Sequence, residues 1–309
     1  MKIAFTSCFR YEAFPEQKEW DYILAQNPDY LFLLGDSIYM DFGYFPFSKE
    51  PVGKPKHYST EKFRAIMNTK YRNQFEKVNS FKTLVDTMRE KNGFYAIWDD
   101  HDFAWDNSKG ALICNEKKNI SRELFHYYTK CTTNMPHVFY HVDTPLARVI
   151  FLDNRTDAED SGANSILLSE EQFLFIEDKI EHSLPYTLIC GGLTLTEGNE
   201  NWTKYPAQLT RLCNLLEGRK KVFFLSGDIH YNDFKKPIFL KKLGCTTPPQ
   251  LISSGMQINY LGLGLGFDNK HNWAMLSLEE DTAAVTFYKG SKPQKKLTEE
   301  ANKWIQQNY

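Results

Sequence analysis

The sequence predicts an α/β protein, a sandwich of mixed β-sheet with helices on the outside. Short apolar runs recur along the 309 residues, and several lack alternation, which is typical of strands covered on both faces. Helical patterns lie between the runs, as expected for α/β layers. Two later pairs of runs have short polar connections and predict antiparallel hairpins.

The expected strands share lengths of four to seven residues and many β-branched and aromatic side chains. They cover residues 2–7, 30–34, 94–98, 138–142, 148–152, 187–190, 221–226, 272–277 and 283–288. The predicted hairpins are 138–142 with 148–152 and 272–277 with 283–288.

Helices are expected over residues 60–90, after Ser169, over 207–217 and over 297–307. Apolar side chains recur at helical spacing in the first region. Ser169 precedes Glu170-Glu171-Gln172, which is typical of a helix N-cap.

Residues 41–58 predict a long loop, because they contain two glycines and three prolines. A loop of this length in a compact domain is often functional, so we expect it to form one wall of a site. We find no repeat, low-complexity tract or linker, and therefore expect a single domain over residues 1–309.

The composition argues against several classes of protein. The net charge of −2 and the absence of a long like-charge run disfavour nucleic-acid binding. No run approaches the ~20 apolar residues of a membrane span. No secretory leader is visible, so we expect a cytoplasmic protein, or a secreted or periplasmic one if a leader was trimmed. Six scattered cysteines without CxxC spacing indicate reduced thiols rather than a disulfide framework.

Polar side chains follow four of the expected strands. The fragments are Thr6-Ser7-Cys8, Gly35-Asp36-Ser37-Ile38-Tyr39, Trp98-Asp99-Asp100-His101-Asp102 and Ser226-Gly227-Asp228-Ile229-His230. Strand ends are where an open α/β fold places its ligand site. Oxygen, nitrogen and sulfur donors at four such ends predict a shared site for a polyvalent cation.

Each fragment offers chemistry suited to such a site. Asp36 can bridge two cations, and the phenolate of Tyr39 is a good ligand for a hard trivalent metal. The three clustered carboxylates after Trp98 repel one another unless a cation neutralises them. His101 is a candidate general acid, or a group that holds an anionic substrate oxygen.

The last fragment places Asp228 and His230 at i and i+2, so both side chains lie on one side if the strand geometry persists. Cys8 is a candidate thiolate ligand because the other fragments are present. Each fragment has a structural alternative: an acidic turn with a core tyrosine, a solvated turn, or a core cysteine.

Together these fragments resemble the alkaline phosphatase D (PhoD-like) branch of the calcineurin-like metallophosphoesterases. That branch carries S-C at the first strand, then G-D-x-I-Y, W-D-D-H-[DE] and S-G-D-[VI]-H. Further similar segments are Leu152-Asp153-Asn154-Arg155, Asn201-Trp202 with Tyr205-Pro206-Ala207, and Ser253-Ser254-Gly255. The resemblance runs from residue 3 to about 278.

The resemblance implies an α/β/β/α sandwich of two mixed sheets flanked by helices. It also implies a ferric ion and calcium, although other divalent metals remain open. By carry-over, Cys8, Asp36, Tyr39 and His230 would hold iron, with Asp36 bridging. Asp100 and Asp228, and less securely Asp99, would hold the second metal or metals, and His101 would contact the phosphate.

The expected function is metal-dependent hydrolysis of phosphate mono- or diesters by a metal-activated hydroxide, with Asp100 and His101 catalytic. Arg155 is expected to clamp a phosphoryl oxygen, unless it forms a structural pair with Asp153. Trp202, Tyr205 and aromatic residues of the loop (Phe42, Tyr44, Phe45 and Phe47) are candidates for receiving an organic leaving group, although core or surface packing is the more common fate of any single one. Alternatives are a phospholipase-like or nucleotide phosphodiesterase activity on the same centre, and a non-catalytic calcium-binding relative. The expected partner is a small phosphate ester, with no nucleic acid.

Overall fold

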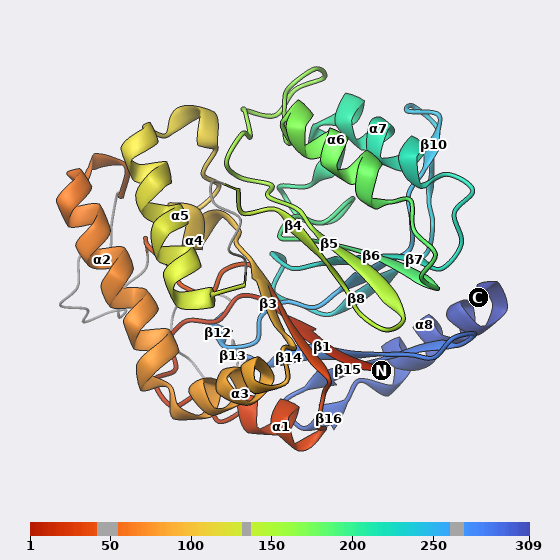
Figure 1. Ribbon diagram of the computed structural model, residues 1–309, viewed down its shortest axis with the longest axis horizontal. Helices are drawn as coiled ribbons and strands as arrows, with labels where there is room; N and C mark the ends of the chain where they lie inside the picture. The colour runs from red at the N-terminus through yellow and green to blue at the C-terminus, as the bar shows by residue number, and fades with distance from the viewer. Residues whose placement is uncertain (42–54, 132–136, 260–268) are drawn as a thin grey trace.

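The structure is a computed structural model that describes residues 1–41, 55–131, 137–259 and 269–309. Two six-stranded sheets pack face to face, and helices lie outside them (Figure 1). This arrangement confirms the predicted α/β/β/α sandwich with two mixed sheets.

The first sheet combines strands from both ends of the chain. Its order is β16 (Lys292–Pro293), β15 (Ala283–Lys289), β14 (Asn272–Leu278), β1 (Lys2–Thr6), β2 (Tyr30–Leu34) and β3 (Phe94–Ile97). β1, β2 and β3 are parallel, whereas β14 runs antiparallel to β1 and to β15. The carboxyl ends of three neighbouring strands therefore meet at one edge of this sheet.

The second sheet is built from the middle of the chain. Its order is β4 (Tyr140–Asp143), β5 (Ala147–Phe151), β6 (Tyr186–Gly191), β7 (Val222–Ser226), β11 (Gln250–Ile252) and β8 (Asp233–Lys235). The four central strands are parallel and the two edge strands are antiparallel. Two short pairs join β9 (Phe239–Leu240) to β10 (Cys245–Thr246), and β12 (Ile258–Asn259) to β13 (Asn269–Lys270). Both predicted hairpins, β4–β5 and β14–β15, are confirmed.

The helices cover the outer faces of the sandwich. They are α1 (Trp20–Ala25), α2 (Thr60–Arg72), α3 (Asn79–Glu90), α4 (Asp100–Phe103), α5 (Asn115–Thr129), α6 (Glu170–Lys179), α7 (Pro206–Leu216) and α8 (Lys295–Asn308). Single turns of 3₁₀ helix are η1 (Pro55–His57), η3 (Gly110–Leu112) and η4 (Trp202–Lys204), and η2 (Asn73–Lys77) is a π-helix. α6 and α7 lie over the second sheet, and α8 packs along β15 (Figure 1).

Local sequence explains where several helices begin. The hydroxyl of Ser169 accepts a hydrogen bond from the backbone N–H of Gln172 at 3.3 Å, which confirms the predicted N-cap of α6. Ser59 caps α2 in the same way. The predicted helical region 60–90 is divided by η2, and the extended backbone of Val78 separates η2 from α3.

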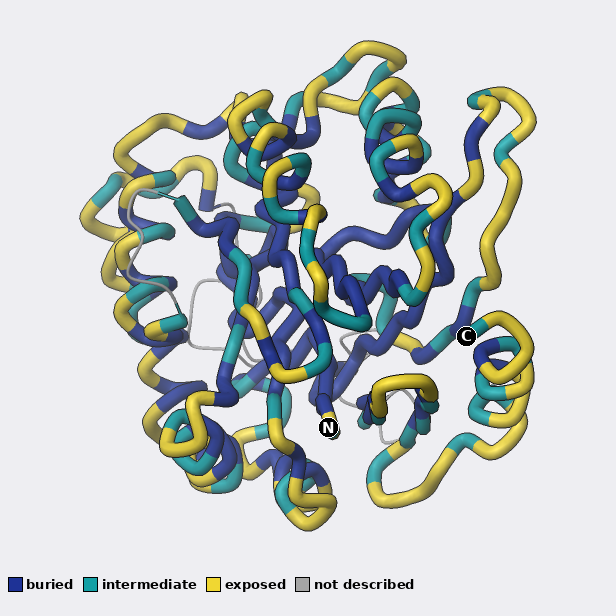
Figure 2. The backbone as a smooth tube through the Cα atoms, turned by 45° about the vertical axis from the view of Figure 1, so that its right-hand side comes forward, coloured by how far each residue is buried: buried dark blue, intermediate teal, exposed yellow. Residues whose placement is uncertain are grey.

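Aromatic side chains join the two sheets in the core. The rings of Phe32 on β2 and Phe151 on β5 are edge to face, with centroids 5.3 Å apart. The Tyr140 hydroxyl donates to the carbonyl of Ala96 on β3 at 2.8 Å and accepts from its N–H at 3.0 Å. Figure 2 shows the central strands buried and the outward faces of the helices exposed. This rigid core fixes the positions of the strand ends.

None of the helices in the described part of the chain combines the length and apolar character that crossing a bilayer requires. Most of the predicted loop 41–58, including its four aromatic residues at 42–47, lies outside the described residues.

Candidate metal centre

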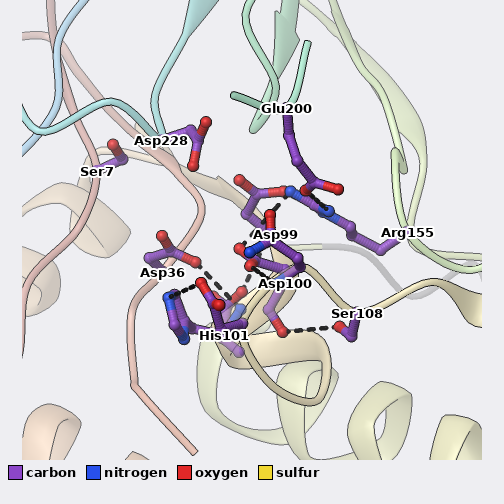
Figure 3. A network of polar contacts seen from close by, with 12 residues as sticks. Ser7, Asp36, Asp99, Asp100, His101, Ser108, Arg155, Glu200 and Asp228 are labelled. Carbon is purple, nitrogen blue, oxygen red and sulfur yellow. Dashed lines mark hydrogen bonds and ion pairs between the residues drawn. The ribbon is translucent and has the colours of Figure 1, made fainter. Parts of the chain in front are cut away.

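The four polar fragments meet where strand ends of the two sheets face each other. Asp36 follows β2, Asp99 and Asp100 follow β3, and Asp228 follows β7 of the other sheet. One carboxylate oxygen from each of these residues lies within 4.8 Å of the others (Figure 3). Asp36, Asp100 and the ring of His101 form a second such group. Strands that the sequence separates by more than a hundred residues thus supply one constellation.

The backbone of this region is strained at the residues whose side chains converge. Cys8, Asp36, Asp228 and His230 have φ values of 59°, 54°, 69° and 58°. Non-glycine residues in this left-handed region cost on the order of 1–3 kcal/mol each, and such residues cluster at functional sites. All four are among the metal ligands that the sequence predicts.

Glycines let the backbone approach the carboxylates closely. A Cβ atom on Gly192, just beyond β6, would lie 2.3 Å from Cγ of Asp99. A Cβ on Gly35, whose φ is +96°, would lie 2.4 Å from Cβ of Asp99. Only glycine fits at these two positions, so Asp99 rests in a cradle of main chain.

Cys8 and Tyr39 contact one oxygen of Asp36, and His230 lies beside Tyr39. The thiol of Cys8 donates to Oδ2 of Asp36 at 3.2 Å, and the hydroxyl of Tyr39 donates to the same oxygen at 3.4 Å. The Tyr39 hydroxyl is also 3.3 Å from Nε2 of His230. Ser254 joins this group, because its hydroxyl donates to Sγ of Cys8 at 3.2 Å and accepts from the N–H of His230 at 2.9 Å. The four predicted iron ligands are therefore linked in one chain of contacts, with Ser254 joining its two ends.

The other side of the cluster is held by Arg155. Its Nε donates to Oδ1 of Asp99, its Nη2 lies 3.6 Å from Oδ1 of Asp100, and its Nη1 donates to Glu200 at 2.7 Å. Glu200 also accepts from Nζ of Lys109. Arg155 is fully buried. The side chain of Arg155 thus pairs with Asp99 and Glu200, whereas Asp153 accepts from the backbone N–H of Arg155.

His101 is oriented by two neighbouring groups. Its Nδ1 is 2.7 Å from Oδ1 of Asp41, and its ring lies against the ring of Tyr39 with centroids 4.1 Å apart. Nε2 is 3.7 Å from a carboxylate oxygen of Asp106. The backbone N–H of His101 donates to Oδ1 of Asp36 at 3.3 Å, which ties α4 to the end of β2.

Asp102 links the two neighbouring strand ends without joining the constellation. Its side chain accepts from the N–H of Ser37 at 3.0 Å and from the N–H of Asp99 at 2.6 Å. These two hydrogen bonds fix the loops after β2 and β3 relative to each other. Burial raises the pKa of Asp102 to about 7.

Without a metal ion, most carboxyl groups of the site have raised pKa values, because they are buried and lie close together. Burial raises the pKa of Asp36 well above its ordinary value and that of Asp228 to about 8, and neighbouring charges raise both further. Burial also raises the pKa of Asp99 in spite of Arg155. At Asp100 burial is outweighed by Arg155 and His101, and the pKa is lowered. The acids therefore resist simultaneous ionisation unless a cation is added.

The two imidazoles have opposite tendencies. Burial works against protonation of His101, but Asp100 and Asp41 outweigh it and hold its pKa well above the ordinary value. Burial, together with the charge of His101, lowers the pKa of His230 to about 4. A neutral His230 suits a metal ligand, and a protonated His101 suits a proton donor.

Two buried carboxylate oxygens give a separate reason to expect metal ions at this site. Oδ2 of Asp99 and Oδ1 of Asp100 are buried and have no hydrogen-bond partner within the described part of the chain. Such oxygens are costly in a protein interior, and a metal ion is one explanation for them. Carboxylate oxygens suit a hard cation such as calcium, and thiolate, phenolate and imidazole donors suit a transition metal.

The structure brings all seven predicted metal ligands, His101 and Arg155 into this region. It places Trp202 elsewhere: the side chain is fully buried in the cluster between the second sheet and helices α6 and α7. Tyr205 is buried in the same cluster. Sequence reasoning missed Asp41, Lys109, Glu200 and Ser254. Ser254 lies in a segment whose family similarity was noted, and Asp41 begins the loop that was expected to form one wall of the site, whereas Lys109 and Glu200 follow no strand that would have drawn attention to them.

Comparison with known proteins gives results consistent with this geometry. Residues 3–126 match the sequence model of a family described as PhoD-like phosphatase. No curated protein sequence matches the chain. A solved structure described as that of PhoD is 16% identical, with a TM-score of 0.69, and the match covers 94% of this chain and 70% of that one. The structure of TT1561 from Thermus thermophilus is 10% identical, with a TM-score of 0.45, covering 92% of this chain and 97% of that one.

Proposed function

We propose that this chain, which matches a PhoD-like phosphatase family model over residues 3–126 and shares its fold with a solved PhoD structure, hydrolyses phosphate esters at a metal centre. One observation carries the proposal. Four carboxylates from strand ends of both sheets converge within 4.8 Å, and two of their buried oxygens have no hydrogen-bond partner among the described residues. We propose mono- and diesters of phosphate as the substrate class.

We propose that Cys8, Asp36, Tyr39 and His230 hold a ferric ion and that Asp36, Asp99, Asp100 and Asp228 hold calcium. The contacts of Asp36 with the first group and its place in the second support a bridging role. When bound, the cations would offset charge on phosphoryl oxygens and make water more acidic.

The side chains of the protein contribute proton transfer and positioning. His101 donates a proton to the leaving-group oxygen, and its raised pKa keeps that proton available at neutral pH. Asp41 accepts from Nδ1, which fixes the orientation of the ring and places the transferable proton on Nε2. Arg155 is fully buried and holds Asp99 and Asp100 in place, which supports a positioning role for its side chain rather than contact with a phosphoryl oxygen. The burial of Trp202 and Tyr205 gives no support to their contact with substrate.

The test is a hydrolysis assay with metal-loaded protein on p-nitrophenyl phosphate, bis(p-nitrophenyl) phosphate and glycerol phosphate. Asp36→Asn removes the shared carboxylate and should abolish turnover of all three. His101→Gln should slow glycerol phosphate far more than the nitrophenyl esters, because nitrophenolate leaves without a proton. Asp178→Asn, an exposed change on α6, is the matched control and should leave the rates unchanged.

Two outcomes would redirect the proposal. Metal binding without turnover of any ester would make this chain a non-catalytic metal-binding relative. Turnover of the diester alone would favour a phosphodiesterase or phospholipase-like activity over a phosphomonoesterase.

A further inference from the structure

A cavity of about 410 Å³ lies between α7, β10 and α8, away from the metal centre. α7 and β10 pack side by side (Figure 1). The lining includes Cys213 from α7, Cys245 from β10, Pro249 and Trp304. Two cysteines from different elements therefore line one cavity that is large enough to admit a small molecule.

The two thiols are neighbours. Both belong to the cluster that α7 forms with the second sheet, and their exposed fractions are 2% for Cys213 and 6% for Cys245. Burial raises the pKa of the Cys213 thiol, and the adjacent Cys245 raises it further through its charge and by hydrogen bonding. α7 packs directly against β10, so the two cysteines lie on contacting elements and line the same cavity.

We propose that Cys213 and Cys245 form a reversible disulfide when a small peroxide enters this cavity. The bond would add a covalent link between α7 and β10, which already pack against each other. Both cysteines are free thiols in the structure, so the pair is in its reduced state. This modification site is independent of the metal chemistry proposed above.

The chemistry balances with hydrogen peroxide as the oxidant. One sulfur, after losing its proton, attacks a peroxide oxygen. The O–O bond breaks, hydroxide leaves and a sulfenic acid forms. The second sulfur attacks the sulfenic sulfur, the S–S bond forms, the S–O bond breaks and the oxygen leaves as water. Two thiols lose two electrons and two protons, and one peroxide becomes two molecules of water.

The geometry also divides the roles of the two cysteines. Cys245 is the more exposed of the two and so the easier for a peroxide to reach. The pKa of Cys213 is raised by burial and in part by its neighbour, so Cys213 stays protonated at neutral pH. We therefore assign Cys245 as the sulfur that is oxidised first and Cys213 as the resolving thiol.

The test is peptide mapping of the full-length, metal-loaded protein carrying Cys114→Ser, which removes the one exposed thiol among the described residues. The protein is treated with hydrogen peroxide, then unfolded and alkylated. We expect one cross-linked peptide joining Cys213 to Cys245, a loss of two free thiols per chain, and full reversal by dithiothreitol. The oxidised protein should melt at a higher temperature than the reduced protein, because a cross-link restricts the unfolded chain.

Variants assign the two roles. Cys245→Ala should abolish the cross-link and leave Cys213 as a thiol, whereas Cys213→Ala should leave Cys245 as a sulfenic acid that a dimedone probe captures. Cys190→Ala, a buried cysteine in the other cluster, should still form the cross-link. The proposal is wrong if peroxide converts the exposed Cys114 of the unmodified chain while Cys213 and Cys245 both remain free. It is equally wrong if the link forms only after the chain is unfolded, and both results can be read on the natural chain without any variant.

Discussion

At the residue scale, the acidic groups of the centre are buried, and this burial underlies both their raised pKa values and their proposed binding of metal ions. Asp36 is 1% exposed, adopts a left-handed backbone and contacts Cys8 and Tyr39. A buried carboxylate without a counter-charge takes up a proton, and burial accordingly raises the pKa of Asp36. The same features make Asp36 a strong ligand once a cation supplies the missing charge.

The contact between Asp41 and His101 leads to a prediction about catalysis. Asp41→Ala removes the acceptor 2.7 Å from Nδ1, so the ring loses its fixed orientation and tautomer. We expect kcat for glycerol phosphate to fall about 10- to 100-fold, the range typical of such outer partners, with little change in KM. Steady-state kinetics measures this.

Asp106→Ala is the matched control. That side chain is 63% exposed and lies 3.7 Å from the other ring nitrogen, so we expect kcat to change only slightly. If Asp41→Ala retained the full kcat, Asp41 would have no part in orienting His101.

The predictability of the site also differs from residue to residue. The convergence of Cys8, Asp36, Asp100, Asp228 and His230 could be predicted because rare donor types follow buried strands directly, whereas their role as ligands stays a prediction. Glu200 and Lys109 could not, because the pairing of Glu200 with both Arg155 and Lys109 depends on loops that the fold brings together. Trp202 was expected to meet substrate, yet an aromatic side chain beside a motif is as easily used for packing, and here it is buried.

At the element scale, each strand end is coupled to a neighbouring one by main-chain contacts. Asp102 in α4 binds the N–H groups of Ser37 and Asp99. The loop after β6 presses Gly192 against the Asp99 side chain. Movement of one element therefore shifts ligands on another.

Gly192→Ala tests this coupling. Its Cβ would overlap the Asp99 carboxyl, which cannot retreat because Arg155 holds it from the other side. We expect metal affinity to fall about 10- to 100-fold, as measured by titration of the metal-free protein. Gly218→Ala has nothing within 4 Å of the new Cβ, so it carries only a backbone cost of about 1 kcal/mol and should bind metal normally. Equal metal affinity in the two variants would contradict the role of Gly192.

The capping hydroxyl of Ser169 gives a prediction that concerns stability alone. Ser169→Ala leaves the N–H of Gln172 without its acceptor at the start of α6. We expect the free energy of unfolding to fall by about 1 kcal/mol, with kcat unchanged. Urea unfolding measures the loss, and Ser169→Asp should restore most of it. A variant as stable as the natural chain would show that the cap contributes nothing.

Element prediction from sequence succeeded where periodicity was strong. The strands that carry the ligands, the two hairpins and α6 to α8 were all expected. α5 was not, because its N-cap residue Cys114 makes no side-chain cap hydrogen bond and its C-cap residue Lys130 is in a left-handed conformation. The two-residue strands β9, β10, β12 and β13 have too few residues to show any period.

At the scale of the whole molecule, the sandwich exists because distant segments pair. β14 lies beside β1, with Ala4 opposite Met275. The sequence predicts the layers and the mixed sheets, but periodicity carries no information about which strands become neighbours. The site depends on that neighbour order, because it places the end of β7 opposite the ends of β2 and β3. The assignment of residues 1–309 to one domain stays a prediction.

The crowded acids predict an unusual pH dependence for the metal-free protein. The pKa of Asp228 is about 8 in the folded state against 3.8 for the ordinary group. A raised folded-state pKa means that stability is fully present below pH 3.8 and is lost progressively as the pH rises toward 8. Asp102, with a pKa of about 7, acts in the same direction.

We therefore expect the melting temperature of the metal-free protein to fall between about pH 5 and pH 8, and metal ions to restore it at the upper end of that range. Differential scanning calorimetry of metal-free and metal-loaded protein across this range measures both effects. A metal-free protein whose stability rises toward pH 8 would contradict the electrostatics described here.

The most direct test of the central claim is elemental analysis of protein purified without chelators, comparing the natural chain with Asp36→Asn. We predict iron and a divalent cation such as calcium in the natural chain, both lost in Asp36→Asn. The metal-free variant should remain folded and be at least as stable as the metal-free natural chain at about pH 8, because it lacks a costly buried charge. A natural chain that carries no bound metal and takes none up on titration would contradict the account.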